Sequence, residues 1–208
     1  MAKVKICGIS HEIEIGIMNE LRPDYIGFVF VPRSKRFIAP EHAGHLRAKL
    51  NPAIKTIGVF SNASLNTVAM CVETSGIDFI QLHGDETREY IASLRELIHC
   101  PIIKAFKVKR AIDAERAMNT PADYVMLDSG EGSGKTFDWS LIGNTSRRYF
   151  LAGGLTPENV QQALSITPQP YCLDVSTGVE SNRLKDYRKV MKFILAVREF
   201  RKKQNTGL

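Results

Sequence analysis

The chain has 208 residues, of which 44% are hydrophobic and 24% are charged. This composition is ordinary for a folded globular protein and excludes the disordered and fibrous classes. The longest apolar runs are far shorter than the roughly 20 residues of a membrane-spanning helix, and the first residues show no secretory leader. We therefore expect a cytoplasmic protein with no membrane partner. The four cysteines are scattered without close pairing, which predicts neither a disulfide framework nor a zinc site.

The positive charge is concentrated near the carboxyl-terminal end. The formal net charge is +6, yet residues 183–208 alone hold nine basic and two acidic side chains, so the rest of the chain is close to neutral. A helix is predicted over residues 183–203, with an apolar stripe made of Leu184, Tyr187, Met191, Ile194 and Leu195. We expect an outer helix with a solvated basic face. A surface for nucleic acid or for another chain is the alternative.

Eight short β-branched or aromatic runs recur at nearly equal spacing. They cover residues 4–7, 25–30, 54–60, 78–83, 101–106, 123–128, 148–154 and 171–176. Segments of helical period separate them, which indicates parallel strands joined by crossover helices. Such units form either a doubly wound open sheet or a closed barrel. The count of eight, with no GxGxxG or GxxxxGK[ST] motif after the first strand, favours an α/β fold of the (β/α)₈ TIM-barrel type, as one domain over residues 1–208.

Capping residues mark the ends of several predicted helices. Gly76 is expected to end a helix over residues 62–75. Asp85 is expected to be the N-cap of the next helix, over residues 86–98. Thr156, which is followed by a proline and an acid, has the pattern of an N-cap at the start of the helix after the seventh strand.

Two glycine-containing loops follow the seventh and eighth predicted strands. The first contains Gly153 and Gly154, and the second contains Ser176, Thr177 and Gly178. In a barrel of this kind, functional groups gather where the strands end. Exposed backbone N–H groups, small hydroxyl side chains and a helix dipole suit a phosphate dianion. We therefore expect a small phosphorylated substrate to bind at these two loops.

Cys7 and Asp128 end the first and sixth predicted strands, so both are expected to face the mouth of the barrel. An ionised thiol is a competent base or nucleophile, and a carboxylic acid can donate a proton. The alternative for Cys7 is an inert core residue, as we expect for Cys71 and Cys172. The alternative for Asp128 is a helix cap or a salt-bridge partner.

Three further features lie at predicted strand ends. Arg36 belongs to a basic loop after the second strand, where a guanidinium can hold a carboxylate through two hydrogen bonds. His83 ends the fourth strand and is expected to contact the substrate. A glycine-rich loop over residues 129–137 follows the sixth strand but lacks the full P-loop spacing. We expect this loop to cover the site.

Seven motifs between residues 5 and 180 resemble those of the phosphoribosylanthranilate isomerase family. They are KICGI (5–9), GFVF (27–30), RSKR (33–36), QLHGD (81–85), GSGKTFDW (132–139), AGGLTPENV (152–160) and DVSTGVE (174–180). The resemblance implies conversion of N-(5-phosphoribosyl)anthranilate to 1-(2-carboxyphenylamino)-1-deoxyribulose 5-phosphate in tryptophan biosynthesis. It also implies that the reaction uses no metal or organic cofactor.

The resemblance implies roles for individual residues as well. Cys7 is expected to be the general base and Asp128 the general acid of an Amadori rearrangement. Arg36 is expected to bind the anthranilate carboxylate, and the two glycine-containing loops are expected to bind the phosphate. This chemistry needs a proton on the ring oxygen as the furanose opens, followed by removal of the proton on C2′, which are tasks for an acid and a base.

Two other functions fit parts of the sequence. Lys104, near the end of the fifth predicted strand, is a candidate Schiff-base lysine for an aldolase that acts on a sugar phosphate. The basic terminal segment is a candidate nucleic-acid surface, although it lacks interleaved aromatic residues. Neither function uses Cys7, Arg36 and Asp128 together, so we expect no nucleic-acid partner. The sequence does not indicate the oligomeric state.

Overall fold

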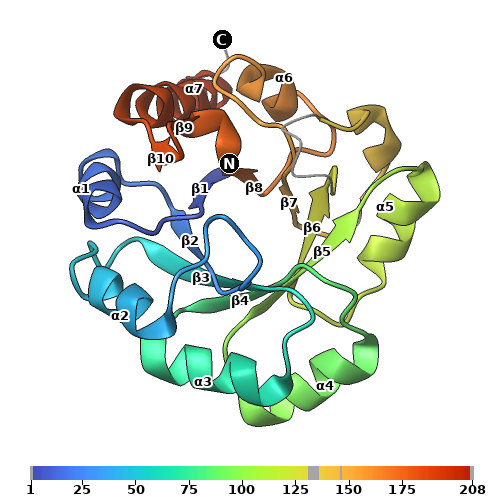
Figure 1. Ribbon diagram of the computed structural model, residues 1–208. Helices are drawn as coiled ribbons and strands as arrows, with labels where there is room; N and C mark the ends of the chain where they lie inside the picture. Colours follow the sequence, from blue (N-terminus) through green and yellow to red (C-terminus); the bar gives the residue numbers. More distant parts are fainter. Residues whose placement is uncertain (1, 131–135, 146, 207–208) are drawn as a thin grey trace.

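Eight parallel strands close into a barrel in the computed structural model, which describes residues 2–130, 136–145 and 147–206 (Figure 1). The strands pair in chain order and β8 pairs with β1. They are β1 (Lys3–Cys7), β2 (Tyr25–Val29), β3 (Lys55–Phe60), β4 (Phe79–Leu82), β5 (Ile102–Lys107), β6 (Tyr124–Asp128), β7 (Tyr149–Leu151) and β8 (Cys172–Val175). The prediction of a closed barrel rather than an open sheet is therefore confirmed.

The helices form a ring outside the barrel (Figure 1). They are α1 (Glu12–Leu21), α2 (Pro40–Ala48), α3 (Leu65–Ser75), α4 (Arg88–Leu97), α5 (Ala111–Met118), α6 (Val160–Leu164) and α7 (Tyr187–Thr206). In the described part of the β6–β7 connection the helical element is the short 3₁₀ helix η1 (Trp139–Ile142). A second one, η2 (Thr177–Val179), and the hairpin of β9 (Glu180–Ser181) and β10 (Leu184–Lys185) follow β8. Among the described helices, none combines the length and the apolar character that crossing a lipid bilayer requires.

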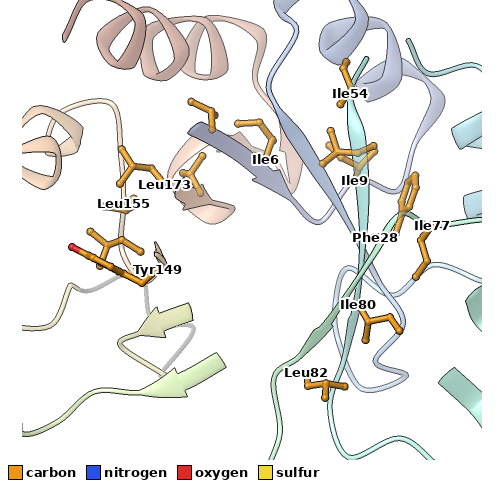
Figure 2. Packing of buried hydrophobic residues seen from close by; sticks show 14 of the residues in the cluster. Ile6, Ile9, Phe28, Ile54, Ile77, Ile80, Leu82, Tyr149, Leu155 and Leu173 are labelled. Atoms are coloured by element: carbon orange, nitrogen blue, oxygen red, sulfur yellow. The ribbon is translucent and has the colours of Figure 1, made fainter. Parts of the chain in front are cut away.

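Alternation of side chains along the strands separates two apolar layers. Side chains such as Ile6, Phe28 and Ile80 belong to the large cluster between the strands and the helices (Figure 2). A smaller cluster, which includes Tyr25 and Phe150, fills the inside of the barrel. Both faces of a parallel sheet are covered in this way, which explains why the strand segments are so rich in apolar residues.

The interior of the barrel becomes polar towards the ends of the strands. Lys5, Gln81 and Asp174 are buried inward-facing residues near the ends of β1, β4 and β8. Cys7 and Asp128 are the last residues of β1 and β6. A buried polar group is tolerated only where it is hydrogen-bonded, so this end of the barrel is built around specific polar contacts.

Two predicted helix starts were wrong, because a different residue caps the helix. The third helix begins at Leu65, three residues later than expected, since the Ser64 hydroxyl accepts a hydrogen bond from the backbone in its first turn. The fourth helix begins at Arg88, because Thr87 and not Asp85 supplies the capping oxygen. A hydroxyl at the true N-cap satisfies an N–H group that the helix leaves free.

The helix after β7 also begins later than expected. The Thr156 hydroxyl accepts a hydrogen bond from the N–H of Glu158 at 3.2 Å, and the Thr156 carbonyl accepts one from Val160 at 3.1 Å. Thr156 therefore caps a turn that leads into α6, and the helix proper starts at Val160. Gly76 ends α3 in the left-handed conformation, with φ of 65°, as predicted for a C-terminal glycine.

The predicted boundary and buried face of the last helix were wrong. The helix begins at Tyr187 rather than at residue 183, because Leu184 belongs to the β9–β10 hairpin. Its buried residues are Val190, Phe193, Ile194 and Val197. Of the predicted stripe, Ile194 is buried and Met191 is partly buried, whereas Leu195 is 44% exposed.

Candidate active site

A cavity of about 370 Å³ lies at the carboxyl-terminal ends of the strands. All nine predicted site residues line it, namely Cys7, Arg36, His83, Asp128, Gly153, Gly154, Ser176, Thr177 and Gly178. Polar residues that were not predicted line it too, namely Ser34, Gln81, Ser129, Thr156 and Asp174. The volume is near the lower end of the roughly 300–1,000 Å³ that is usual for small-molecule sites.

Cys7 has space for its side chain because its partner in the β1–β2 register is Gly27. A Cβ atom on Gly27 would lie 2.7 Å from Cys7 Sγ and 3.3 Å from Lys5 Cε. Burial raises the pKa of the Cys7 thiol, and the positive charges of Lys5 and Lys185 offset only part of this effect. Cys7 is therefore a protonated thiol in the free protein at neutral pH.

Lys5 lies in the centre of the barrel and is completely buried. Its Nζ atom donates hydrogen bonds to Gln81 Oε1 and to Asp174 Oδ2, both at 2.9 Å. Burial by itself lowers the pKa of Lys5, but the negative charge and hydrogen bond of Asp174, and Cys7 in its thiolate form, outweigh it, so that the pKa lies above its ordinary value. A fixed positive charge therefore lies close to the Cys7 thiol.

A directed chain of hydrogen bonds links this lysine to Asp128. Gln81 accepts from Lys5 through Oε1, so its Nε2 group donates to His83 Nδ1 at 2.8 Å. Because His83 Nδ1 accepts, the ring carries its proton on Nε2. His83 Nε2 lies 3.1 Å from Asp128 Oδ2 and donates to it. The imidazole therefore has a fixed tautomer, and the Asp128 carboxylate is its acceptor.

Asp128 is an ionised carboxylate in the free protein. Burial raises its pKa, but the hydrogen bond from His83 and its electrostatic attraction, with donors from Gly130 and Ser129, outweigh burial and hold the pKa below its ordinary value. Gly153, at φ of 89°, provides the space, since a Cβ atom there would lie 2.8 Å from Asp128 Oδ1. A side chain at this position would displace the carboxylate.

The loops after β7 and β8 pack against each other at the cavity wall. A Cβ atom on Gly178 would lie 2.0 Å from the Leu155 carbonyl oxygen, so this position requires glycine. The N–H groups of Gly153 and Gly154 donate to no other described residue. Two free N–H groups beside small hydroxyl side chains form an anion-binding environment.

Arg36 is already paired with a carboxylate that the sequence did not indicate. Its Nε and Nη2 atoms donate to the two oxygens of Glu180, at 2.7 and 2.8 Å, and Nη2 also donates to Thr177 Oγ1 at 3.0 Å. Gly8 lies against the side chain, since a Cβ atom there would lie 2.3 Å from Arg36 Cδ. Lys185 donates to the same Glu180 at 2.6 Å, so Glu180 balances two positive charges.

Lys104 does not line the cavity of Cys7 and Asp128, but it lines an adjoining cavity together with His83 and Asp128. Its Nζ atom donates to the Gly84 carbonyl at 2.6 Å and to Glu86 Oε2 at 3.1 Å. A third hydrogen bond, to the Ala105 carbonyl at 3.2 Å, occupies the remaining donor of the amine. This geometry argues against the aldolase alternative.

The predicted covering loop, 129–137, is only partly described. Residues 131–135 lie outside the described residues, and Ser129 lines the cavity. In the described ranges, no group of three or more His, Cys, Asp or Glu side chains is arranged to hold a metal ion.

The buried polar residues that were not predicted could have been found from their spacing along the strands. Gln81 lies two residues before His83, and Asp174 lies two residues before Ser176, so each shares the inward face of its strand. Lys5 has the same relation to Cys7. What the sequence does not reveal is that Lys5 contacts both Gln81 and Asp174 across the barrel.

Comparison with known proteins supports the resemblance. Residues 4–196 match the family model described as N-(5′-phosphoribosyl)anthranilate (PRA) isomerase. The N-(5′-phosphoribosyl)anthranilate isomerase of Endomicrobium trichonymphae is 38% identical over 203 residues, which cover 95% of this chain and 99% of that protein.

Solved structures agree with this match. The phosphoribosyl anthranilate isomerase of Thermus thermophilus superposes with a TM-score of 0.87 at 32% identity, over 95% of this chain and 99% of that one. A phosphoribosyl anthranilate isomerase in complex with reduced 1-(o-carboxyphenylamino)-1-deoxyribulose 5-phosphate has a TM-score of 0.84 at 35% identity, over 96% of this chain and 100% of that one. The chain therefore belongs to the N-(5′-phosphoribosyl)anthranilate isomerase family.

Proposed function

We propose that this protein converts N-(5-phosphoribosyl)anthranilate to 1-(2-carboxyphenylamino)-1-deoxyribulose 5-phosphate, with Cys7 as the base and Asp128 as the acid. The observation that carries the proposal is the arrangement of groups around one cavity. In barrel order from β6 to β2, the wall presents Asp128, the two phosphate-binding loops, Cys7 and Arg36. An acid, an anion site, a base and a cation thus follow one another along the wall of a cavity that is large enough for a small molecule.

The substrate's two anionic groups fix its orientation in this proposal. The phosphate binds the N–H groups of the loops that contain Gly153, Gly154 and Ser176. The anthranilate carboxylate binds the Arg36 guanidinium, whose Nη1 group donates to no other described residue. The sugar then lies between the phosphate loops and Arg36, within reach of both Cys7 and Asp128.

Ring opening is the first chemical step. The lone pair of the anthranilate nitrogen forms the C1′=N bond while the bond from C1′ to the ring oxygen breaks. Asp128, in its acid form, gives its proton to the departing ring oxygen. A positioned acid of this kind typically accelerates such a step by about 10²–10⁴-fold.

Removal of the C2′ proton follows. The iminium acidifies C2′–H, and the Cys7 thiolate takes this proton while a C1′=C2′ double bond forms and the nitrogen regains its lone pair. The enolamine becomes the ketone by losing the proton of its C2′ hydroxyl and gaining one at C1′. The number of atoms and electrons is unchanged, as an isomerisation requires.

In the free protein, the protonation states of Cys7 and Asp128 are the opposite of those that the proposed roles require. Substrate binding therefore has to reverse them. The free protein holds one proton on Cys7 and none on Asp128, as the directions of their pKa shifts indicate. A bound phosphate and carboxylate bring negative charge and exclude water, and both effects raise the pKa of a nearby carboxyl group. The charge of Lys5 lowers the pKa of the Cys7 thiol. Binding therefore raises the pKa of Asp128, and because the same effects act on the thiol, the charge of Lys5 is what keeps the Cys7 thiolate accessible.

Removing either proton-transfer group tests the proposal. We expect Cys7→Ala and Asp128→Ala each to lower kcat by about 10²–10⁴-fold, while calorimetry still detects binding of the reduced product analogue. Cys100→Ala is the matched control, because Cys100 lies outside the cavity and is expected to leave kcat unchanged. Near-wild-type turnover in either active-site variant would contradict the assignment.

A further inference from the structure

The floor of the cavity contains a carboxylate with an unused acceptor. Three buried side-chain polar atoms have no hydrogen-bond partner among the described residues, namely Trp139 Nε1, Thr145 Oγ1 and Asp174 Oδ1. Of these residues, Asp174 is the one that lines the active-site cavity. A buried acceptor without a partner is costly, so an unmet carboxylate oxygen at a substrate cavity indicates a missing donor.

A hydrogen bond from Lys5 holds the Asp174 side chain in position. Asp174 faces Lys5 in the β1–β8 register, and Oδ2 accepts from Lys5 Nζ at 2.9 Å. The side chain is 8% exposed. The neighbouring polar group on the floor, Gln81, uses its oxygen for Lys5 and its nitrogen for His83. Asp174 is therefore the floor residue that retains an acceptor for a ligand.

Asp174 is also close to the thiol. Lys5 Cε and Cys7 Sγ both lie against Gly27, so the partner of Lys5 lies beside the cysteine. Ser176, on the same face of the chain two residues after Asp174, donates from Oγ to the Cys7 carbonyl at 2.9 Å. Asp174 thus lies below the phosphate loop and next to the base.

We propose that the Asp174 carboxylate accepts a hydrogen bond from the C2′ hydroxyl of the substrate. This inference rests on the proposed function, in which Cys7 removes the proton from C2′. The hydroxyl on that carbon is the sugar substituent nearest to the base. Its hydrogen bond to Asp174 orients the C2′–H bond towards Cys7, and it makes a hydroxyl on the reacting carbon a requirement for tight binding.

A ligand-by-variant cycle tests this contact. The probes are the reduced product analogue and its C2-deoxy and C3-deoxy forms, titrated by calorimetry into the wild-type protein and Asp174→Asn. We expect Asp174→Asn to weaken the parent and the C3-deoxy analogue by about 10–100-fold, as for a hydrogen bond to a charged group. The C2-deoxy analogue lacks the donor, so we expect a loss of less than about 3-fold. Asp123→Asn, a carboxylate at the start of β6 that accepts from Ile102 N, is the control and is expected to change none of the three affinities.

Each other outcome has a distinct meaning. Equal losses for all three analogues would overturn the inference and assign Asp174 a structural role. The inference would also be overturned if Asp174→Asn weakened binding of the parent and the C2-deoxy analogue but not of the C3-deoxy analogue. It would likewise be overturned if Asp174→Asn weakened binding of none of the three. Failure of the wild-type protein to bind the parent analogue would instead contradict the proposed function. Should Asp174→Asn not fold, Lys5→Met/Asp174→Asn removes the buried charge pair, and the same ligand pattern is expected.

Discussion

At neutral pH, Cys7 and Asp128 together carry one proton, and the position of this proton determines how activity depends on pH. In the proposed mechanism the active form has a thiolate and a protonated Asp128, whereas the pKa shifts give the free protein the reverse. Between the two pKa values, a rise in pH produces thiolate and removes the acid to the same extent. The fraction of active form is therefore constant over that interval.

We expect kcat/KM to be nearly flat from about pH 5 to about pH 8, a range between the ordinary pKa values of a carboxyl and a thiol group. Below the pKa of Asp128, which is lowered, both groups are protonated and kcat/KM falls. Above the pKa of Cys7, which is raised, both groups are deprotonated and kcat/KM falls again. Steady-state kinetics across this range measure the profile, and a sharp maximum near neutrality would contradict it.

Lys5 stabilises the thiolate by its charge. Its removal in Lys5→Met eliminates a cause that lowers the pKa of Cys7, so the alkaline limb should move to higher pH and kcat/KM should fall. Alkylation of Cys7 by iodoacetamide, followed against pH in a Cys100→Ala background, reports the same shift. Lys3→Met is the control, since Lys3 bonds to Tyr25 at the other end of the barrel. An unchanged alkylation profile would exclude this role.

At the scale of the elements, the close contact of β1 and β2 positions the Cys7 side chain. Gly27→Ala adds a Cβ atom 2.7 Å from Cys7 Sγ, which is closer than the two atoms can approach, so we expect kcat to fall by more than tenfold. Gly16→Ala is the matched control. Gly16 lies within α1 with no other atom within 4 Å of an added Cβ, so we expect a gain of about 0.5–1 kcal/mol in stability and unchanged kcat. Equal activity in the two variants would refute the steric argument.

The buried face of α7 is open to a similar test. Phe193 is completely buried, so Phe193→Ala should lower the free energy of unfolding by about 3–5 kcal/mol. Leu195 is largely exposed, and Leu195→Ala should change it by less than about 1 kcal/mol. Urea denaturation measures both. The reverse order would support the stripe that the periodicity predicted.

For the whole molecule, the sequence was sufficient to predict the barrel and the residues around its mouth. Strands that are covered on both faces form continuous apolar runs, so their order and number are readable. The side chains at the ends of those runs then gather at one edge, as Cys7, His83 and Asp128 do. The glycines after β7 and β8 were recognisable because tightly packed loops at strand ends need positions without a side chain, as Gly153 and Gly178 show.

Other features depend on contacts between distant parts of the chain. The pairing of Arg36 with Glu180 joins residues 144 positions apart, and Lys5 meets Asp174 across 169 positions. No local pattern specifies such contacts. The buried face of α7 was mispredicted for a related reason, because the β9–β10 hairpin takes up Leu184 and the packing against the barrel selects the face.

The isomerisation of N-(5-phosphoribosyl)anthranilate by the whole molecule can be followed directly. The most direct measurement mixes the purified protein with this compound, generated enzymatically, and follows the fluorescence of the anthranilate group. We expect the fluorescence to disappear at a rate proportional to the protein concentration, with Cys7→Ala and Asp128→Ala slower by about 10²–10⁴-fold. Decay no faster than in the absence of the protein would contradict the isomerase activity.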